Sequence, residues 1–382
     1  MTRQDPFHPP FEYARLRAEG PVVRAKLAAE QGRLVWLVTR YEEAKQVLSD
    51  TRFSSDCRRP GFPSRRTFSA MIRMDPPDHT HYRRMLNGEF GASRIAELRP
   101  LIQELTDGLL DRIAAGPSPV DLVPTLAMPL PSLVICHLLG VPYSDHVFLQ
   151  ERTTAALRAD SSQAEIDGAV DDLGRYMDGV VRRKARDLGD DLLSRLIADQ
   201  VQAGGCTLDA AADLARLLLV AGHVTTVNMI GLGILTLLQH PQQMRQLRAD
   251  PQLVVPAVNE LLRHLSITAT LSRVATEDLA VGGTMIRAGE GVLVLLSSAN
   301  RDERAFDAPD EFDIHRAERG NLAFGWGPHI CLGASLARLE LRVVFDSVLR
   351  RFPNLACAVP LDDIPFREKV LIYGVHELPV TW

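Results

Sequence analysis

The chain has 382 residues, of which 46% are hydrophobic, so it is long and apolar enough to bury a large core. Its 43 lysines and arginines are mixed along the chain with 48 aspartates and glutamates, and the net charge of −5 argues against the concentrated basic surface that nucleic-acid binding needs. Five scattered cysteines without a CxxC or CxxCH motif argue against a disulfide framework, a zinc ribbon and covalently attached haem. The first twenty residues contain no apolar signal region, so we expect a cytoplasmic protein.

Helical periodicity dominates the chain. In chain order, the patterns predict a strand at 34–39, helices at 95–114, 122–139, 164–188, 191–203, 208–239, 241–249 and 253–265, strands with a Gly-Gly turn within 279–296, a helix at 334–351 and strands within 369–382. No linker or internal repeat divides the chain, and the best candidate break, 114–121, is only a loop's worth of residues. We therefore predict a single domain over residues 1–382, mainly α with small β-sheets at both sequence ends.

One segment, residues 217–238, is long and apolar enough to suggest a membrane span, which needs about 20 residues. Polar residues interrupt it, namely His223, Thr225, Thr226, Asn228 and Thr236, and ordinary globular sequence flanks it on both sides. A helix buried all round in a large core explains this pattern better. We therefore expect no membrane-spanning segment here.

The sequence "FGWGPHICLG" at residues 324–333 carries the most specific chemistry. Cys331 falls just before the amphipathic helix at 334–351, and a helix N-terminus favours a thiolate. The surrounding glycines suit a backbone that approaches a flat ligand, although a glycine-rich turn around an inert cysteine would look the same. His329 and Cys331 are too close together to chelate zinc unaided, and no second pair lies nearby. A lone thiolate in a helical protein suits the axial ligand of haem iron.

Four motifs, in the right order, resemble the cytochrome P450 family of haem-thiolate monooxygenases. The stretch at 324–333 matches the family's Phe-Gly-x-Gly-x-His-x-Cys-x-Gly signature, "NELLRH" its Glu-x-x-Arg pair, "MDPPDHTHYRRM" its haem-facing helix and "ANRDERAF" the segment before its meander. The resemblance covers essentially the whole chain, in the soluble bacterial style. It implies the P450 fold, with haem b between the long central helix and the cysteine-loop helix, Cys331 as the axial ligand, and Phe324, Gly325 and Gly333 around it.

The resemblance also implies roles for charged residues. His79, Arg83, Arg273 and His329 would bind the haem propionates, and His79 and Arg83, four apart, would share one helix face. Each of these alone would be read as a solvated surface cation. Glu260 and Arg263 would form a buried structural pair, completed by either His315 or Arg316.

Within the central helix, Ala221, Gly222 and Thr225 match the family's oxygen-binding segment, and Thr225 its oxygen-activating threonine. Small and β-branched residues are equally typical of a packed helix crossing. The departure is Val224, where the family usually has an acid that feeds protons to the threonine. Three explanations stay open: Thr225 and ordered water suffice, the substrate supplies a polar group, or the reaction does not need ordinary oxygen scission. His223 is turned by about 100° on the helix, so we do not expect it to replace the acid.

Family geometry implies an apolar substrate pocket. Its expected wall comprises the loop 57–73, Ala221 and Val224, the terminal turn 371–373, and the residues Leu217, Val220, Thr268, Ala269, Thr270, Leu271 and Ile372. Four arginines in the loop 57–68 would suit an acidic or carrier-tethered substrate, or simply a solvated loop. The expected reaction is O2-dependent hydroxylation or epoxidation of a small, largely apolar molecule in secondary metabolism.

No segment is typical of a flavin or nicotinamide domain, so the resemblance implies electrons from a ferredoxin and a ferredoxin reductase. Arg84, Arg338 and Arg342 are candidate contacts, and we expect a monomer. Two alternatives stay open. One is a peroxide-using, coupling or rearranging enzyme of P450 type, which Val224 motivates. The other is a non-catalytic haem-thiolate binding protein, which would have no use for Thr225.

Overall fold

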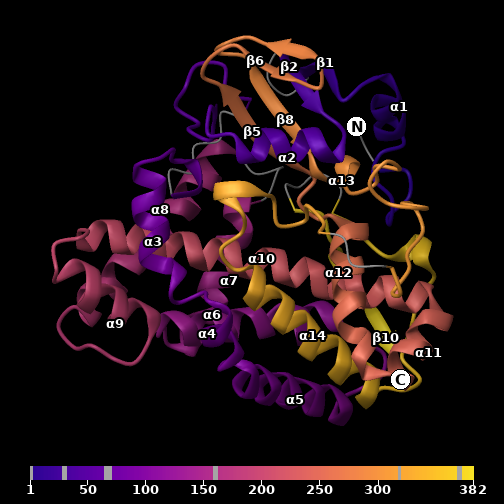
Figure 1. The fold of residues 1–382 in the computed structure, drawn as a ribbon. Helices are drawn as coiled ribbons and strands as arrows, with labels where there is room; N and C mark the ends of the chain where they lie inside the picture. The colour runs from indigo at the N-terminus through magenta and orange to yellow at the C-terminus, as the bar shows by residue number, and fades with distance from the viewer. Residues whose placement is uncertain (1–2, 28–31, 64–70, 158–161, 317–319, 368–371) are drawn as a thin grey trace. The chain divides into compact units, whose positions relative to one another are not determined.

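The computed structural model describes residues 3–27, 32–63, 71–157, 162–316, 320–367 and 372–382 (Figure 1). Contacts within the chain divide it into two compact units. The first contains Met1–Arg84 and Asn259–Ala334, and the second contains Met85–Val258 and Ser335–Trp382. Each unit is thus built from two separate stretches of sequence. The single domain over residues 1–382 stays a prediction.

A five-stranded sheet forms the centre of the first unit. Its strands are β1 (Val22–Leu27), β2 (Arg33–Val38), β3 (Phe53–Ser54), β5 (Thr270–Ala275) and β8 (Gly291–Leu295). The order is β1-β2-β8-β5-β3, with β2 and β8 parallel and the other neighbours antiparallel. The predicted class, mainly α with small β-sheets, is confirmed, but the sequence analysis did not predict that early and late strands share this sheet. Pairing between such distant segments leaves no local pattern in the sequence.

The predicted Gly-Gly hairpin is confirmed in the same unit. Strands β6 (Leu279–Val281) and β7 (Thr284–Ile286) pair antiparallel across Gly282 and Gly283, whose φ angles are +55° and +82°. These left-handed conformations favour glycine. A Cβ on Gly282 would also lie 2.5 Å from Cγ of Pro21, so the turn has no room for a larger residue.

Short helices cover the sheet of the first unit. They are α1 (Glu12–Glu19), α2 (Tyr41–Ser49) and α13 (Leu296–Ala299). The unit also contains parts of α3 (Asp78–Asn87) and α12 (Val254–Leu265). Helix α2 packs against β8 and α13 (Figure 1). It buries Tyr41, Ala44, Val47 and Leu48, whose spacing places them on one face. The sequence analysis did not predict α2.

The second unit is mainly helical. Its helices are α4 (Ala92–Ala96), α5 (Arg99–Ala115), α6 (Pro129–Leu139), α7 (His146–Leu157), α8 (Gln163–Lys184), α9 (Leu192–Leu196), α10 (Leu208–Gln239), α11 (Pro241–Ala249) and α14 (Ala334–Arg351). Helix α10 packs against α6, α7 and α8 (Figure 1). A three-stranded sheet of β4 (Val120–Asp121), β10 (Pro379–Thr381) and β9 (Ala356–Cys357) completes the unit.

Several predicted helices of this unit are shorter or interrupted. The stretch 95–114 divides into α4 and α5, and Pro100 stands in the first turn of α5. The stretch 122–139 opens with a π-helical turn, Val123–Ala127, before α6 starts at a proline. Proline lacks an N–H donor and is tolerated in a first turn, so it starts a new helix here rather than continuing the old one. The predicted terminal strand is reduced to β10 among the described residues.

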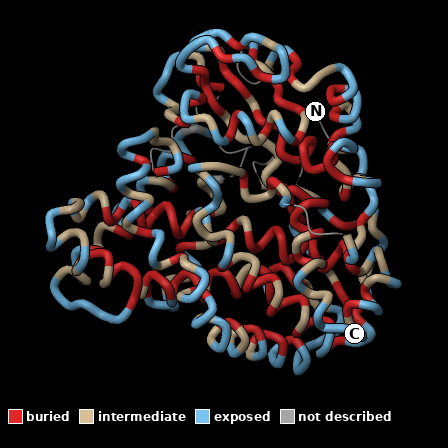
Figure 2. Tube along the Cα trace, in the orientation of Figure 1, coloured by how far each residue is buried: buried red, intermediate tan, exposed pale blue. Residues whose placement is uncertain are grey.

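Helix α10 is long and apolar enough to cross a membrane by length and composition, yet 83% of its most apolar window is buried inside the protein. Figure 2 shows this burial along the helix. The expectation of a buried core helix is met in the structure. Its close packing is visible at Gly233, where an added Cβ would lie 2.4 Å from Cζ of Phe345 on α14.

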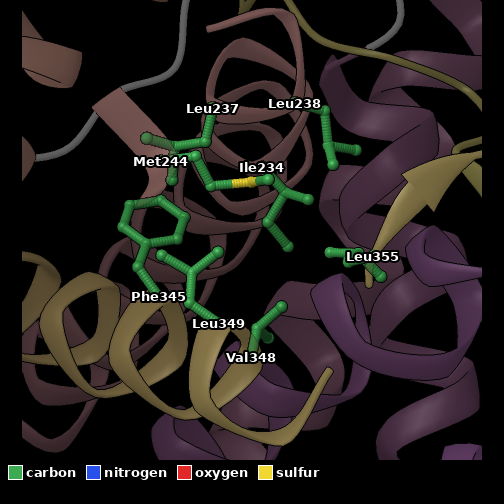
Figure 3. A pocket seen from close by; sticks show the side chains of 8 residues that line it. All are labelled: Ile234, Leu237, Leu238, Met244, Phe345, Val348, Leu349 and Leu355. Atoms are coloured by element: carbon green, nitrogen blue, oxygen red, sulfur yellow. The ribbon is translucent and has the colours of Figure 1, made fainter. Parts of the chain in front are cut away.

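Apolar side chains of α10, α11 and α14 meet in the pocket of Figure 3. It is lined by Ile234, Leu237, Leu238, Met244, Phe345, Val348, Leu349 and Leu355. The space between these side chains admits no water molecule, and no polar side chain faces it. This pocket is therefore part of the packed core and not a ligand site.

Candidate functional site

The cysteine loop, residues 320–333, carries Cys331 and lies in the first unit, directly before α14. The Cys331 N–H donates to Phe324 O at 2.9 Å, and the Gly325 N–H donates to Leu322 O at 2.9 Å. Gly325 and Gly327 both have φ of +72°, a conformation that favours glycine. All five cysteines lie in the described part of the chain, and Cys331 alone among them is exposed. The loop thus holds an exposed sulfur on a hydrogen-bonded backbone.

Basic side chains gather beside this loop. His79 on α3 stacks on His329, with ring centroids 3.9 Å apart. Burial lowers the pKa of His329 to about 3, helped by the positive charges of Arg273, His79, Arg83 and Arg73. Burial likewise lowers the pKa of Arg273 to about 10, with a further contribution from Arg73. Each of these basic groups therefore makes the protonated form of its neighbours less favourable.

Few acids balance this cluster. Asp75 is the nearby carboxylate, and it accepts hydrogen bonds from the Ser54 hydroxyl and the Ser55 N–H and pairs with Arg59 at 3.4 Å. His79 is 2% exposed, and its Nδ1 has no hydrogen-bond partner among the described residues. A buried polar atom without a partner is costly. This set of donors fits an anionic ligand with more than one carboxylate, such as haem with its two propionates.

Arg73 and Asp75 belong to this cluster, and the sequence analysis missed both. They stand at the start of "MDPPDHTHYRRM" or directly before it, so their position beside a recognised motif was the available signal. A small cavity next to the cluster is lined in part by Asp75, Arg273 and His329. It has room for about one water molecule, so it is no substrate chamber.

In the second unit, helix α10 is partly exposed at one place within its buried middle part. Every residue from Leu214 to Leu237 is buried except Ala221, Gly222 and Thr225, so these three form a window of small side chains on a core helix. The Thr225 hydroxyl donates to Ala221 O at 2.7 Å. A Cβ on Gly222 would lie 3.4 Å from Cδ1 of Ile135, so this glycine also brings α6 close.

The residues on either side of Thr225 in α10, Val224 and Thr226, are not acids. Val224 is buried, and its carbonyl accepts a hydrogen bond from Nδ2 of Asn228 at 2.8 Å. His223 is also buried, and burial lowers its pKa to about 4, against the effect of its hydrogen bond to the Met128 backbone. His223 is therefore neutral at pH 7 and engaged with another segment of its unit, which supports the expectation that it does not replace the missing acid.

The Glu-x-x-Arg pair lies deep in the first unit. Arg263 donates to both carboxylate oxygens of Glu260, at 2.7 and 2.8 Å, and the two side chains are 2% and 3% exposed. Arg263 also donates to the carbonyls of Asn300 and Pro309. Of the two candidates for the further basic residue, Arg316 contacts Glu260, with its Nε 3.1 Å from Oε2.

The expected substrate-contacting residues are divided between the two units. Thr268 to Leu271 are half-buried at the start of β5 in the first unit. In the second unit, Leu217 and Val220 are buried on α10, and Ile372 is half-buried. Residues 64–70 of the expected loop, which include Arg65 and Arg66, and Leu371 lie outside the described residues. Of the remaining loop arginines, Arg58 pairs with Asp56 and Arg59 with Asp75.

Comparison with known proteins is consistent across the chain. Residues 159–372 match the family described as Cytochrome P450. Pentalenic acid synthase from Streptomyces avermitilis is 46% identical over 390 residues, covering 100% of this chain and 96% of that protein. Cytochrome P450-SU2 from Streptomyces griseolus is 45% identical over 386 residues, covering 99% and 94%.

A solved structure gives the same result for the fold. The mycinamicin VIII C21 methyl hydroxylase MycCI from Micromonospora griseorubida, bound to mycinamicin VIII, is similar with a TM-score of 0.95 and 40% identity. The match covers 100% of this chain and 99% of that one. Similarity at this identity and over this length extends from the fold to the family.

Proposed function

Because this chain belongs to the cytochrome P450 family, we propose that Cys331 is the axial thiolate ligand of its haem b and that His79, Arg83, Arg273 and His329 bind the haem propionates. The family carries haem with a cysteine thiolate ligand. The observation that carries the assignment is the cluster of basic groups beside the one exposed cysteine. The positive charges of Arg273 and Arg83 favour the propionate carboxylates, and His79 Nδ1 is a buried atom in need of a hydrogen-bond partner. Phe324, Gly325 and Gly333 shape the loop around the ligand.

The protein is a monooxygenase, and the bound haem supplies the activation of O2. We assign proton handling to Thr225, which lies in the α10 window with Ala221 and Gly222. Because the Thr225 hydroxyl donates a hydrogen bond to Ala221 O, the lone pairs of Oγ1 can accept a hydrogen bond from water. The small side chains of Ala221 and Gly222 leave space for oxygen beside that hydroxyl.

The proposed substrate is a small, largely apolar molecule of secondary metabolism, hydroxylated or epoxidised. Leu217, Val220, Ala269, Leu271 and Ile372 would supply apolar contacts, and Thr268 and Thr270 hydroxyls. The relatives support this class: one makes pentalenic acid, and another is a hydroxylase bound to mycinamicin VIII. Carrier tethering of the substrate is a further option, for which the arginines of the loop 57–68 provide positive charge.

Electrons would come from a ferredoxin and a ferredoxin reductase, because no part of the chain is typical of a flavin or nicotinamide domain. We further propose a cytoplasmic monomer. The relatives from Streptomyces are bacterial, in agreement with the soluble bacterial type that the motifs resemble.

The test of the haem assignment is spectroscopic. The purified protein, reduced and exposed to carbon monoxide, should show the red-shifted Soret band of thiolate ligation. Cys331→Ser should lose that band, because a serine hydroxyl is not a thiolate. Cys357→Ser, at a half-buried cysteine of the second unit, should keep it. Protein purified without haem, or a Cys331→Ser variant with the native band, would contradict the proposal.

Val224 favours a second candidate, an enzyme of P450 type that uses peroxide, or couples or rearranges its substrate. Neither Val224 nor the neutral His223 next to it can supply a proton. Under the leading proposal, Val224→Glu should raise the product formed per NAD(P)H consumed, since a positioned acid typically contributes at least about 10²-fold. If coupling and rate stay unchanged, proton delivery does not limit this enzyme. Turnover with peroxide compared with turnover with ferredoxin and reductase then distinguishes the candidates.

A further inference from the structure

We propose that Lys45 of α2 positions the cysteine loop through a cation–π contact with Trp326. A column of aromatic and cationic contacts, running through Tyr41 and Phe306, connects Lys45 to the buried pair of Glu260 and Arg263. The inference rests on the proposed function, in which Cys331 ligates the haem. Every residue that carries it lies in the first unit.

The central contact joins the ammonium group of Lys45 to two aromatic rings. Its Nζ lies 4.7 Å from the centroid of the Trp326 ring and 5.4 Å from that of the Tyr41 ring. The Lys45 side chain is 28% exposed, and Glu42 pairs with it at 3.5 Å. A cation over tryptophan is the most favourable pair of this kind, and partial burial strengthens it.

Helix α2 meets the cysteine loop at two further points. The Tyr41 hydroxyl donates a hydrogen bond to the carbonyl of Gly320, where the loop begins. At Gly327 an added Cβ would lie 2.4 Å from the carbonyl oxygen of Leu48, so backbone lies directly against backbone. Trp326 stands next to this second contact in the chain. Helix α2 therefore supports the loop at its start and close to Cys331.

The column continues from Tyr41 into the interior. The Tyr41 and Phe306 rings meet edge to face, with centroids 5.4 Å apart at an interplanar angle of 88°. Phe306 also contacts Arg263, whose Cζ lies 5.3 Å from the centroid of the Phe306 ring. Tyr41 and Phe306 are 3% and 4% exposed. Because close-packed interiors deform little, the loop is held against the buried Glu260–Arg263 pair.

Trp326 occupies the position that the signature leaves unspecified. In the signature Phe-Gly-x-Gly, the residue between the glycines is variable, and here it is a tryptophan large enough to reach Lys45. A small residue at this position would leave the ammonium group only the Tyr41 ring. The pair of Lys45 and Trp326 thus adds a support that the motif alone does not require.

The experiment uses the haem-loaded protein and the variant Lys45→Met, which keeps the aliphatic stem and removes the charge. Amide hydrogen exchange at Gly325, Ile330 and Cys331, whose N–H groups bond within the loop, should become roughly three- to tenfold faster. Conversion of the reduced carbon-monoxide form from the thiolate band to the thiol band should accelerate by a similar factor. This second readout reports directly on the bond between the Cys331 sulfur and the haem.

Three controls separate positioning from a general loss of stability. Lys45→Arg keeps the cation and should behave like the native protein. Arg24→Met removes the cation 4.9 Å from the Trp36 ring, a similar contact outside the loop, and should leave both readouts unchanged. In the double variant with Trp326→Leu, the two effects should not add, because the residues act as one contact.

Native exchange and conversion rates in Lys45→Met would overturn the inference, as would an equal effect of Arg24→Met. The haem assignment fails by a separate result, which is retention of the thiolate band in Cys331→Ser. The amide exchange measurement does not depend on that band. Failure of the Lys45 proposal and failure of the haem assignment are therefore distinguishable.

Discussion

Glu340 on α14 is a buried acid with an unusual environment. It is 3% exposed, and its Oε2 has no hydrogen-bond partner among the described residues. Burial raises the pKa of Glu340 to about 8, so at pH 7 the folded protein holds this carboxyl protonated. The unfolded chain would release that proton near the ordinary value of 4.5. Glu340 therefore links the stability of the protein to pH.

The folded state binds a proton at Glu340 more tightly than the unfolded state does, and this sets how stability depends on pH. Between about pH 4.5 and about pH 8 the folded state binds the extra proton, so raising the pH through this window lowers the free energy of unfolding, by about 1.4 kcal/mol per pH unit. Glu340→Gln removes that slope, so its stability relative to the native protein should improve as the pH rises from acid to about 8. Urea unfolding of the haem-loaded protein at several pH values measures this difference. The exposed substitution Glu104→Gln is the control, and parallel slopes for native protein and Glu340→Gln would refute the prediction.

At the scale of elements, long and strongly periodic helices were predictable from sequence. The predicted bounds of α10, α11 and α14 agree with the structure, helped by the Thr207 cap and by Pro241 in a first turn. Helix α2 was missed because no capping side chain or proline marks its start, whereas Pro241 marks the start of the equally short α11. Strand pairing was also missed, since β2 and β8 are adjacent only after folding.

The residues of the candidate site were likewise predictable only where the sequence signal is local. A local motif marked Cys331, and four-residue spacing placed His79 and Arg83 together on α3. By contrast, the neighbours of the loop come from distant segments: Lys45 and Tyr41 from α2, and Arg73 and Asp75 from before α3. Nothing in a linear pattern shows that Lys45 reaches Trp326. The choice of Arg316 over His315 likewise needed the position of Glu260.

The distribution of charge matters at the scale of the whole molecule, because the proposed electron donor must find one face of a protein whose net charge is −5. Candidate contacts are Arg84, exposed on α3, and the half-buried Arg338 and Arg342, which are four apart and so share one face of α14. Helix α14 directly follows the cysteine loop. The positive groups of Arg338 and Arg342 on α14 would attract an acidic iron–sulfur protein in spite of the overall negative charge.

Such attraction depends on salt, because charges are screened over about 10 Å at 0.1 M ionic strength and about 3 Å at 1 M. We expect turnover at subsaturating ferredoxin to fall as salt rises, while turnover at saturating ferredoxin changes little. Arg338→Gln and Arg342→Gln should raise the ferredoxin concentration for half-maximal rate about two- to fivefold each, as expected for losing one rim charge. Arg350→Gln, at the far end of α14 and paired with Asp346, is the matched control. Salt-insensitive turnover at low ferredoxin, or an equal effect of Arg350→Gln, would place the docking face elsewhere.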